Sequence, residues 1–178
     1  MKTDKLPVEV FDAACKFQLL NKSTNYNCQK ITDGVSSDIW YVKTEKNREF
    51  CIKRALAKLT VKEDWYAPIS RNKFEAMYFQ NCFEIAPNNF PKLLGYDYKN
   101  YILAMEWYSP DSYLVWKKKL LNKKVEKADI KNVSNLLIKK HKKFFNNKNL
   151  EKQFDNDVTF HSIRIEPYIL FTSEKYPN

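Results

Sequence analysis

Phe50-Cys51-Ile52-Lys53-Arg54 places a lysine inside an otherwise apolar run of residues. A short apolar run of this kind is typical of a β-strand. A charged side chain in such a strand needs a partner or a ligand, because an unpaired charge on a buried surface costs free energy. Glu75 lies 22 residues later in a stretch with helical character, where it can be that partner. A strand-edge Lys53 facing water and an ordinary exposed Glu75 remain the alternatives.

Short strand and helix patterns surround this stretch on both sides. A leading helix is indicated by Val8, Phe11, Cys15 and Leu19, which fall near one helical face. Turn-like residues separate the strands, and Ser70 is a suitable N-cap for a second helix with Phe74, Met77, Tyr78 and Phe83 toward the core. The predicted elements are a helix at 8–20, strands at 28–31, 39–44 and 48–54, a helix at 70–83, and strands at 92–96 and 101–106.

The chain changes character after residue 106 and becomes helical. Helices are predicted at 113–121, 129–145 and 158–174, with Pro167 starting a new helix or kinking the last one. We therefore predict an α+β chain in which residues 1–106 form a sheet-and-helix unit and residues 107–178 a hinge and a helical unit. The later helices carry apolar faces that need a cover, or else form an aggregation-prone patch. Those of 129–145 are Ile130, Val133, Leu137, His141 and Phe144.

The charge balance is strongly basic, with a formal net charge of +10 at pH 7. Lysines neutralise phosphates, so a nucleic-acid-binding protein that uses the lysine-rich segment 117–152 is one alternative. Of 31 basic residues, however, only four are arginine, the residue best suited to base readout and bidentate phosphate contacts. Lysine and asparagine enrichment together indicate a compositional bias. We do not expect nucleic acid to be the main partner.

The four cysteines, Cys15, Cys28, Cys51 and Cys82, show neither CxxC nor Cys/His ligand spacing. We expect them to be buried, reduced thiols rather than a zinc site or a disulfide framework. No apolar run approaches the roughly 20 residues that span a bilayer, and the first residues lack the apolar segment of a signal peptide. The sequence therefore predicts a cytoplasmic protein without a membrane partner.

Glycine is rare, and only Gly34 and Gly95 occur. Gly34 lies between the first two predicted strands, where a tight turn with exposed N–H groups and the hydroxyls of Ser36 and Ser37 can fold over phosphates. An ordinary hairpin turn is the alternative. The strand that ends in Glu106-Trp107-Tyr108 leads directly into the change of composition, and a plain core strand is the alternative there.

Five segments in this order resemble the N-terminal portion of the aminoglycoside phosphotransferase family, whose members are small-molecule kinases with a protein-kinase-like fold. They are DGVSSDIW (33–40), FCIKRAL (50–56), WYAPISRNKFEAMYF (65–79), ILAMEW (102–107) and FHSIRIEPYIL (160–170). The resemblance spans about residues 29–176. It implies a kinase-like N-lobe followed by the first helices of a truncated helical C-lobe, with ATP and magnesium as cofactors and a small-molecule hydroxyl as acceptor.

The resemblance also implies a role for each matching residue. It assigns Gly34, Ser36 and Ser37 to the phosphate loop, Lys53 to the ATP phosphates, Glu75 to Lys53, and Glu106, Trp107 and Tyr108 to the adenine hinge. In protein-kinase-like enzymes a strand lysine that contacts the α- and β-phosphates is paired with a glutamate on the next helix.

The chain departs from the family at the catalytic loop, an HGDxxxxN-like segment. His141 is followed by Lys142-Lys143 and His161 by Ser162-Ile163, so neither begins such a loop. We expect His141 to be a packing residue, and Asp155 and Asp157 to be a solvated helix cap. No catalytic or metal-binding residue is therefore assigned, and the magnesium ligands are expected in a missing C-terminal part.

Positioning and charge neutralisation supply nearly all catalysis in phosphoryl transfer. Because the chain lacks the catalytic loop that provides them, it is predicted to bind nucleotide without turnover. The acceptor stays open: sugars, amino alcohols and aminoglycosides all fit the resemblance. One alternative is a non-catalytic nucleotide-binding module, or one half of a split enzyme completed by a C-terminal polypeptide.

Overall fold

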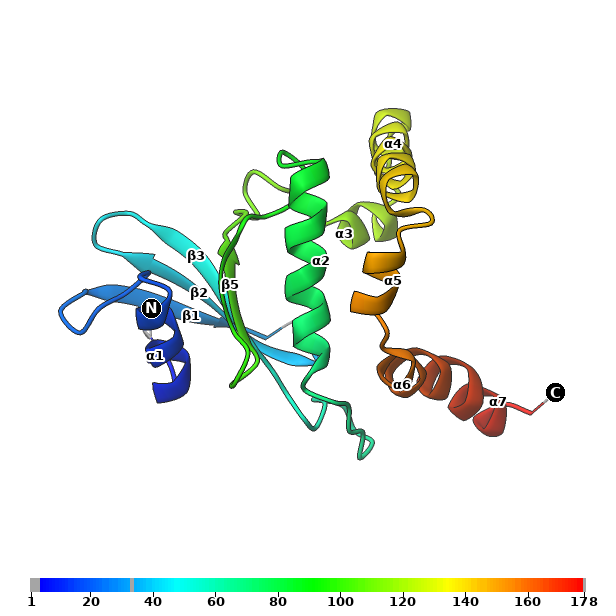
Figure 1. Ribbon diagram of the computed structural model, residues 1–178, viewed down its shortest axis with the longest axis horizontal. Helices are drawn as coiled ribbons and strands as arrows, with labels where there is room; N and C mark the ends of the chain where they lie inside the picture. The colour runs from blue at the N-terminus through cyan, green and yellow to red at the C-terminus, as the bar shows by residue number, and fades with distance from the viewer. Residues whose placement is uncertain (1–3, 33, 178) are drawn as a thin grey trace.

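The structure, a computed structural model, describes residues 4–32 and 34–177. It is an α+β fold built on a five-stranded sheet in which every pair of neighbouring strands is antiparallel (Figure 1). The order of strands is β1-β2-β3-β5-β4. The three strands predicted at 28–31, 39–44 and 48–54 and the two at 92–96 and 101–106 are confirmed, with shifts of one or two residues at their ends. The strands are β1 (Tyr26–Ile31), β2 (Ser37–Thr44), β3 (Glu49–Ala55), β4 (Leu93–Asp97) and β5 (Ile102–Glu106).

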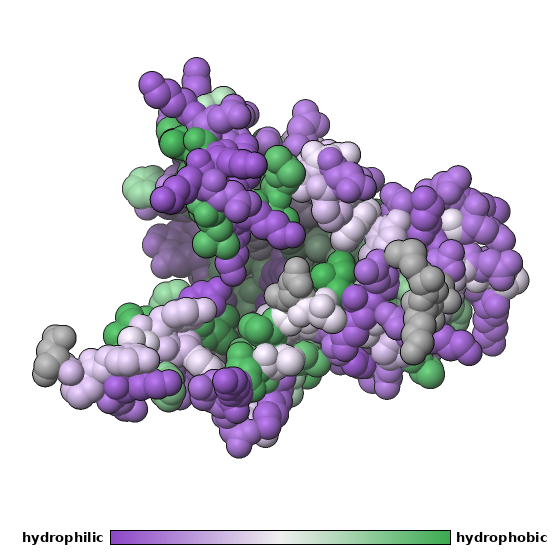
Figure 2. Space-filling view, turned by 180° about the vertical axis from the view of Figure 1, so that it is seen from behind, coloured by the Kyte–Doolittle hydropathy of each residue, from purple (hydrophilic) through white to green (hydrophobic). Residues whose placement is uncertain are grey.

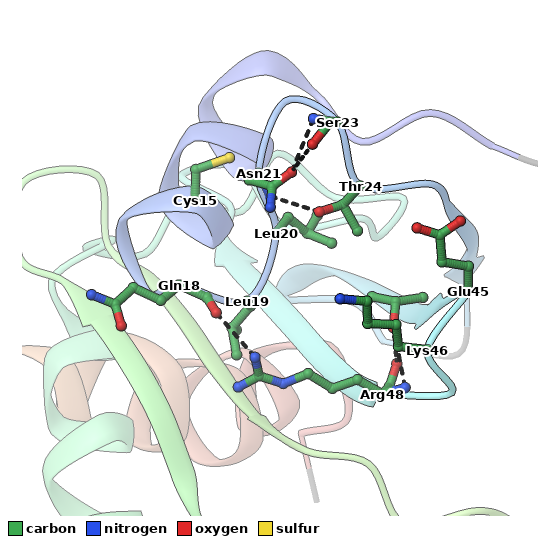
Figure 3. A pocket seen from close by; sticks show the side chains of 11 residues that line it. Cys15, Gln18, Leu19, Leu20, Asn21, Ser23, Thr24, Glu45, Lys46 and Arg48 are labelled. Carbon is green, nitrogen blue, oxygen red and sulfur yellow. Dashed lines mark hydrogen bonds between the residues drawn. The ribbon is translucent and has the colours of Figure 1, made fainter.

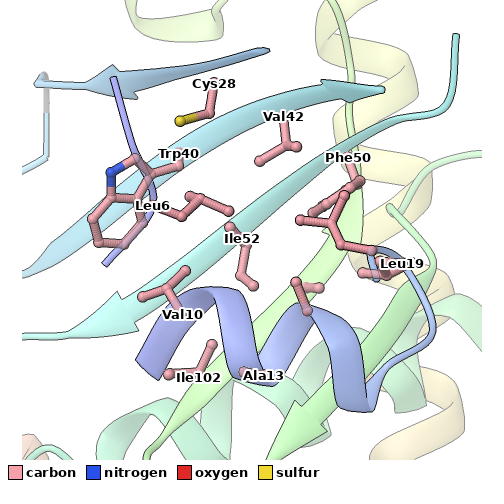
Figure 4. Packing of buried hydrophobic residues seen from close by; sticks show 13 residues of the cluster. Leu6, Val10, Ala13, Leu19, Cys28, Trp40, Val42, Phe50, Ile52 and Ile102 are labelled. Atoms are coloured by element: carbon pink, nitrogen blue, oxygen red, sulfur yellow. The ribbon is translucent and has the colours of Figure 1, made fainter. Parts of the chain in front are cut away.

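Helix α1 (Val8–Lys16) covers one face of the sheet and forms the main core with it (Figure 4). Its buried face is made of Val10, Ala13 and Ala14 rather than the predicted face, because Val8 is 72% exposed. The helix ends earlier than predicted, since Gln18 adopts a left-handed conformation with φ 58°. The core residues that the strands contribute are Cys28, Trp40, Val42, Phe50, Ile52, Ile102 and Ala104.

Helix α2 (Arg71–Ile85) lies on the other side of the sheet from α1 (Figure 1). Ser70 precedes it as predicted, but the serine hydroxyl makes no capping hydrogen bond. The predicted inward face is wrong in part: Tyr78 is exposed, and the fully buried positions of the helix are Asn72, Ala76 and Cys82. The small side chains Ala76 and Cys82 allow the helix to approach its neighbours closely.

A succession of helices follows β5 and leads away from the sheet (Figure 1). The predicted helix 129–145 is confirmed as α4, whereas α5 was not predicted. The predicted helix 158–174 is continuous, but its centre is π-helical and contains Pro167. Proline lacks the N–H that an α-helical hydrogen bond needs, so Pro167 interrupts the regular α-helical pattern. These elements are α3 (Trp116–Leu121), α4 (Lys127–Phe144), α5 (Lys148–Gln153), α6 (Asp157–Phe160), η1 (His161–Leu170) and α7 (Phe171–Lys175).

The later helices bury little of their own apolar surface, and Figure 2 shows apolar patches open among hydrophilic side chains. Ile130, Val133 and Leu137 of α4 are exposed, as the sequence predicted. Leu136 and Phe144 of α4 pack on a small cluster of Cys82, Ala86 and Phe90. His141 was expected in this packing but is exposed, because α4 turns only a narrow stripe toward α2.

Three of the four cysteines are buried and Cys15 is half-buried, and all four are free thiols. This confirms the expectation for three of them. Across residues 4–32 and 34–177, no helix has both the length and the apolar composition that crossing a membrane requires.

Candidate functional site

Lys53 and Glu75 form an ion pair between β3 and α2, with 2.5 Å from the lysine Nζ to the glutamate Oε1. The Lys53 side chain is 15% exposed and that of Glu75 is 30% exposed. The pair that the sequence suggested is therefore present. Both alternatives, a lysine facing water at a strand edge and an unpaired exposed glutamate, are wrong. A largely desolvated pair holds the ammonium in one direction more firmly than a surface pair does.

The sheet face around Lys53 is apolar. In the strand register, Ile39 of β2 and Leu103 of β5 are the direct neighbours of Lys53 on its two sides. Direct cross-strand neighbours share a face, so these three side chains form one row. The next row on the same face consists of Tyr41, Cys51 and Met105. Lys53 is the only charged member of either row, which gives this face one cation in an apolar surface.

Three sequence-predicted groups follow one another along β3. Glu106, which begins the predicted hinge, pairs with Phe50 at the start of the strand. Lys53 lies three residues further on, about 10 Å along the strand. Ser37, which ends the predicted phosphate turn, pairs with Ala55 at the end of β3. Hinge, lysine and turn therefore lie in a line along one strand.

The β1–β2 turn, residues 34–37, is held against the connection between β3 and α2. The Thr60 N–H donates to the Val35 carbonyl at 2.8 Å, and the Leu56 N–H donates to the Ser36 carbonyl at 3.1 Å. Ser36 is half-buried and Ser37 is buried as the first residue of β2. Backbone groups of this turn, together with the Ser36 hydroxyl, are thus better placed to meet a ligand than the Ser37 hydroxyl is.

Gly34 has room for a side chain on the described side of the turn. A Cβ atom there would meet Ile39 Cδ1 at 3.6 Å and the Ser37 carbonyl at 3.7 Å, which are ordinary contacts. Glycine at this position therefore leaves space above the turn.

Two aromatic contacts fix the residues after β5. The Trp107 ring lies 4.7 Å from the Tyr41 ring, and the Tyr108 ring stacks on Tyr113 at 4.5 Å. Burial, helped by the charge of Glu106, raises the pKa of Tyr108. The Glu106 carboxylate accepts a hydrogen bond from the Lys92 N–H at 2.9 Å. Trp107 therefore extends the apolar rows beside Lys53, whereas the Glu106 side chain is engaged by the backbone that leads into β4.

Arg71 is a residue of this region that the sequence did not single out. Its guanidinium donates hydrogen bonds to four backbone carbonyls, including that of Ser36 in the β1–β2 turn. One signal was present in the sequence, because arginine is rare in a chain in which lysine supplies almost all the basic residues. An arginine retained among so many lysines indicates a position that needs a planar group with several donors.

The remaining polar candidates do not join this site. His141, His161, Asp155 and Asp157 are all exposed, in line with a solvated position for the two aspartates. Within the described residues no three His, Cys, Asp or Glu side chains come together as a metal site would require. Cys51 lies beside Lys53, but burial raises its pKa to about 12 and keeps the thiol protonated.

A separate pocket of about 480 Å³ lies on the α1 side, between the end of α1 and the turn that joins β2 to β3 (Figure 3). Arg48 Nη1 donates to the Gln18 carbonyl at 3.0 Å, and Asn21 Oδ1 accepts from the Ser23 N–H and hydroxyl. These polar groups are thus engaged with each other, and the pocket lies on the opposite sheet face from Lys53.

A comparison with known protein families and with curated proteins finds no match for this chain.

Proposed function

We propose that this chain is the ATP-binding half of a kinase-like small-molecule phosphotransferase. The observation that carries the proposal is the Lys53–Glu75 ion pair, which joins the middle strand of the sheet to the helix that follows it. In this proposal the sheet and α2 correspond to a kinase N-lobe, and the helices after Glu106 to the beginning of a helical C-lobe. A lysine held by a glutamate on the next helix is the arrangement that protein-kinase-like enzymes use toward ATP phosphates.

Lys53 would contact the α- and β-phosphates, and Glu75 would keep its ammonium pointed at them. A cation in an apolar, water-poor surface attracts phosphate more strongly than one on an open surface, because screening by water is weaker there. The apolar rows of Ile39 and Leu103 and of Tyr41 and Met105 offer a flat surface for a purine. Backbone groups of residues 106–108 would read the edge of the adenine.

The β1–β2 turn would cover the phosphates from the far end of β3. Gly34 lets a phosphate approach the backbone closely, and Ser36 supplies a half-buried hydroxyl. N–H groups of a short turn form a concave site for anions. The order hinge, lysine, turn along β3 matches the order base, α- and β-phosphate, terminal phosphate in the nucleotide.

ATP would be bound here without phosphate transfer. When bound with magnesium, ATP supplies the γ-phosphoryl group, but the 178 residues contain no HGDxxxxN-like segment to orient an acceptor hydroxyl. Two forms of the proposal remain: a nucleotide-binding module, and one half of a split enzyme that a complementing polypeptide completes. The acceptor class is a small molecule with a free hydroxyl.

Calorimetric titration with ATP and with adenosine tests this proposal. Lys53→Ala should weaken ATP binding about 10- to 100-fold, because a hydrogen bond to a charged group contributes about 1.5–3 kcal/mol. Adenosine should lose little affinity, since it has no phosphate. The matched control is Lys43→Ala, which removes an exposed lysine of the same sheet that pairs with Glu49 at 3.1 Å. Equal ATP affinity in both variants, or no ATP binding by the unmodified chain, would contradict the proposal.

A further inference from the structure

The Arg71 guanidinium connects three backbone segments at the first turn of α2. Nη1 donates to the carbonyls of Ala67 at 3.0 Å and Pro68 at 2.8 Å. Nη2 donates to the carbonyls of Ser36 at 2.5 Å and Leu56 at 2.6 Å. The segments are the β1–β2 turn, the residue directly after β3, and the end of the connection into α2. One side chain thus supplies a hydrogen-bond donor to each of four carbonyls.

The contact with Ser36 sets the orientation of a peptide group in the β1–β2 turn. The Ser36 carbonyl accepts from Arg71 and from the Leu56 N–H, so it points toward β3 and α2. Because a trans peptide is planar, its N–H points opposite to its carbonyl. The Ser37 N–H therefore points away from β3. Arg71 and the Leu56 N–H thus together fix the direction of a backbone donor of the turn.

The same helix also carries the partner of Lys53. Arg71 and Glu75 are four residues apart on α2, so they lie on one face of the helix. Burial lowers the pKa of Arg71, and the nearby Glu75 charge acts in the opposite direction. An arginine stays charged in proteins even so. A shift of α2 would accordingly move the Ser36 carbonyl and the Lys53 ammonium together.

We propose that Arg71 is a positioning residue that holds the β1–β2 turn in its nucleotide-accepting conformation and couples the turn to Lys53 through α2. This role rests on the proposed ATP site. Lysine cannot replace arginine here, because one ammonium has three donors and cannot reach four carbonyls spread over a planar fork. Arg71 is expected to act on the phosphates through the turn, without touching the nucleotide.

Arg71→Lys is the variant of choice, because it keeps the charge and most of the stem. Its control is Arg48→Lys, an arginine that also donates to a backbone carbonyl, that of Gln18, but on the other sheet face (Figure 3). The first readout is amide hydrogen exchange of each variant without nucleotide. Arg71→Lys should raise exchange about tenfold in residues 34–37 and 56–60 while α1 and β4 stay unchanged. Arg48→Lys should leave both segments as they are.

The second readout is affinity for ATP compared with adenosine. Arg71→Lys should weaken ATP about tenfold and leave adenosine within twofold, because only the phosphates meet the turn. Unchanged ATP affinity would overturn the role of Arg71. Equal losses for ATP and adenosine, with faster exchange throughout the sheet, would overturn it too, because they would show a general effect on folding.

A failure of the proposed function would give a different result from a failure of the Arg71 role. An unmodified chain that binds no ATP would remove the ATP site and with it the nucleotide role of Arg71. Local exchange in residues 34–37 would then still report whether Arg71 orders the turn.

Discussion

The sheet region, residues 4–106, and the helical region, residues 107–177, differ in how they bury apolar side chains. Every buried hydrophobic residue that the structure describes lies between Leu6 and Ala104. The helical region instead exposes large apolar side chains from Tyr113 to Tyr176. It makes its contacts with the sheet region through few groups, such as Leu136, Phe144 and the Trp65 indole N–H, which donates to the Ser162 carbonyl at 3.1 Å.

The comparison teaches where stability and function lie. A helix is stable in water mainly when its apolar face is packed, so the sheet region supports its own fold while the helical region depends on its attachment. The ion pair of Lys53 and Glu75 and the four-carbonyl contact of Arg71 both belong to the sheet region. Nucleotide binding should therefore survive changes in the helices after residue 108 that leave the sheet and residues 106–108 intact.

The largest difference between the regions should appear when one phenylalanine is truncated in each. Phe50→Ala should cost about 3–5 kcal/mol of unfolding free energy, because Phe50 is completely buried. Phe145→Ala should change it by less than about 0.5 kcal/mol, because Phe145 is 78% exposed. Urea unfolding followed by circular dichroism measures both. Similar costs for the two variants would break the distinction between the regions.

Enlarging one side chain in each region should also give different losses of stability. A Cβ atom on Gly95 would lie 2.2 Å from Cγ of the Phe17 ring. Gly95→Ala should therefore cost about 1–3 kcal/mol, the usual effect of overpacking. Ala128→Leu adds more atoms to α4 but at an exposed position, so it should be tolerated. Thermal melting of both variants makes the comparison, and a stable Gly95→Ala protein would show that Phe17 can move aside.

A smaller difference in stability between the two regions is expected for two carboxylates, one in each region. Burial disfavours the charged form of Asp97, but Lys16, Asn100 and two backbone N–H groups outweigh it and lower its pKa to about 2. A lowered pKa in the folded state stabilises the protein above pH 4, and this contribution is lost as the pH falls through 2. Asp97→Asn should remove about 1–2 kcal/mol at pH 7 and flatten the acid dependence of stability.

The matched carboxylate in the helical region is Asp129, whose pKa is lowered mainly by its hydrogen bond with Lys119. Because Asp129 is far less enclosed, Asp129→Asn should change the melting temperature at pH 7 less than Asp97→Asn does. The reverse order would show that the helical region is held more firmly than its exposure indicates.

The strands were predictable because their signal is local. Alternating residues and turns such as Glu45-Lys46-Asn47 report the β2–β3 hairpin without any tertiary information. The inward face of α1 was not predictable in the same way. Val8 and Val10 are equally apolar, and only the position of the helix on the sheet decides which of them is buried. Tertiary packing overrides a local pattern in such cases.

The candidate site was predictable where a residue type is unusual for its position in the sequence. A lysine in an apolar strand pointed to a partner, and the structure supplies Glu75. The contact of Arg71 could not be predicted, because its four carbonyls come from segments up to 35 residues away and a carbonyl has no sequence signature. The exposed position of His141 was missed because it depends on how α4 meets α2.

Chemical labelling of lysines tests the central claim most directly. An ATP analogue with an acyl group on its terminal phosphate acylates lysines that lie next to bound phosphates. The chain holds 27 lysines, most of them exposed, so mass spectrometry can show which of them reacts. We predict that Lys53 is labelled far ahead of the others and that an excess of unmodified ATP prevents the labelling. Labelling spread over the exposed lysines and unaffected by ATP would contradict a nucleotide site at Lys53.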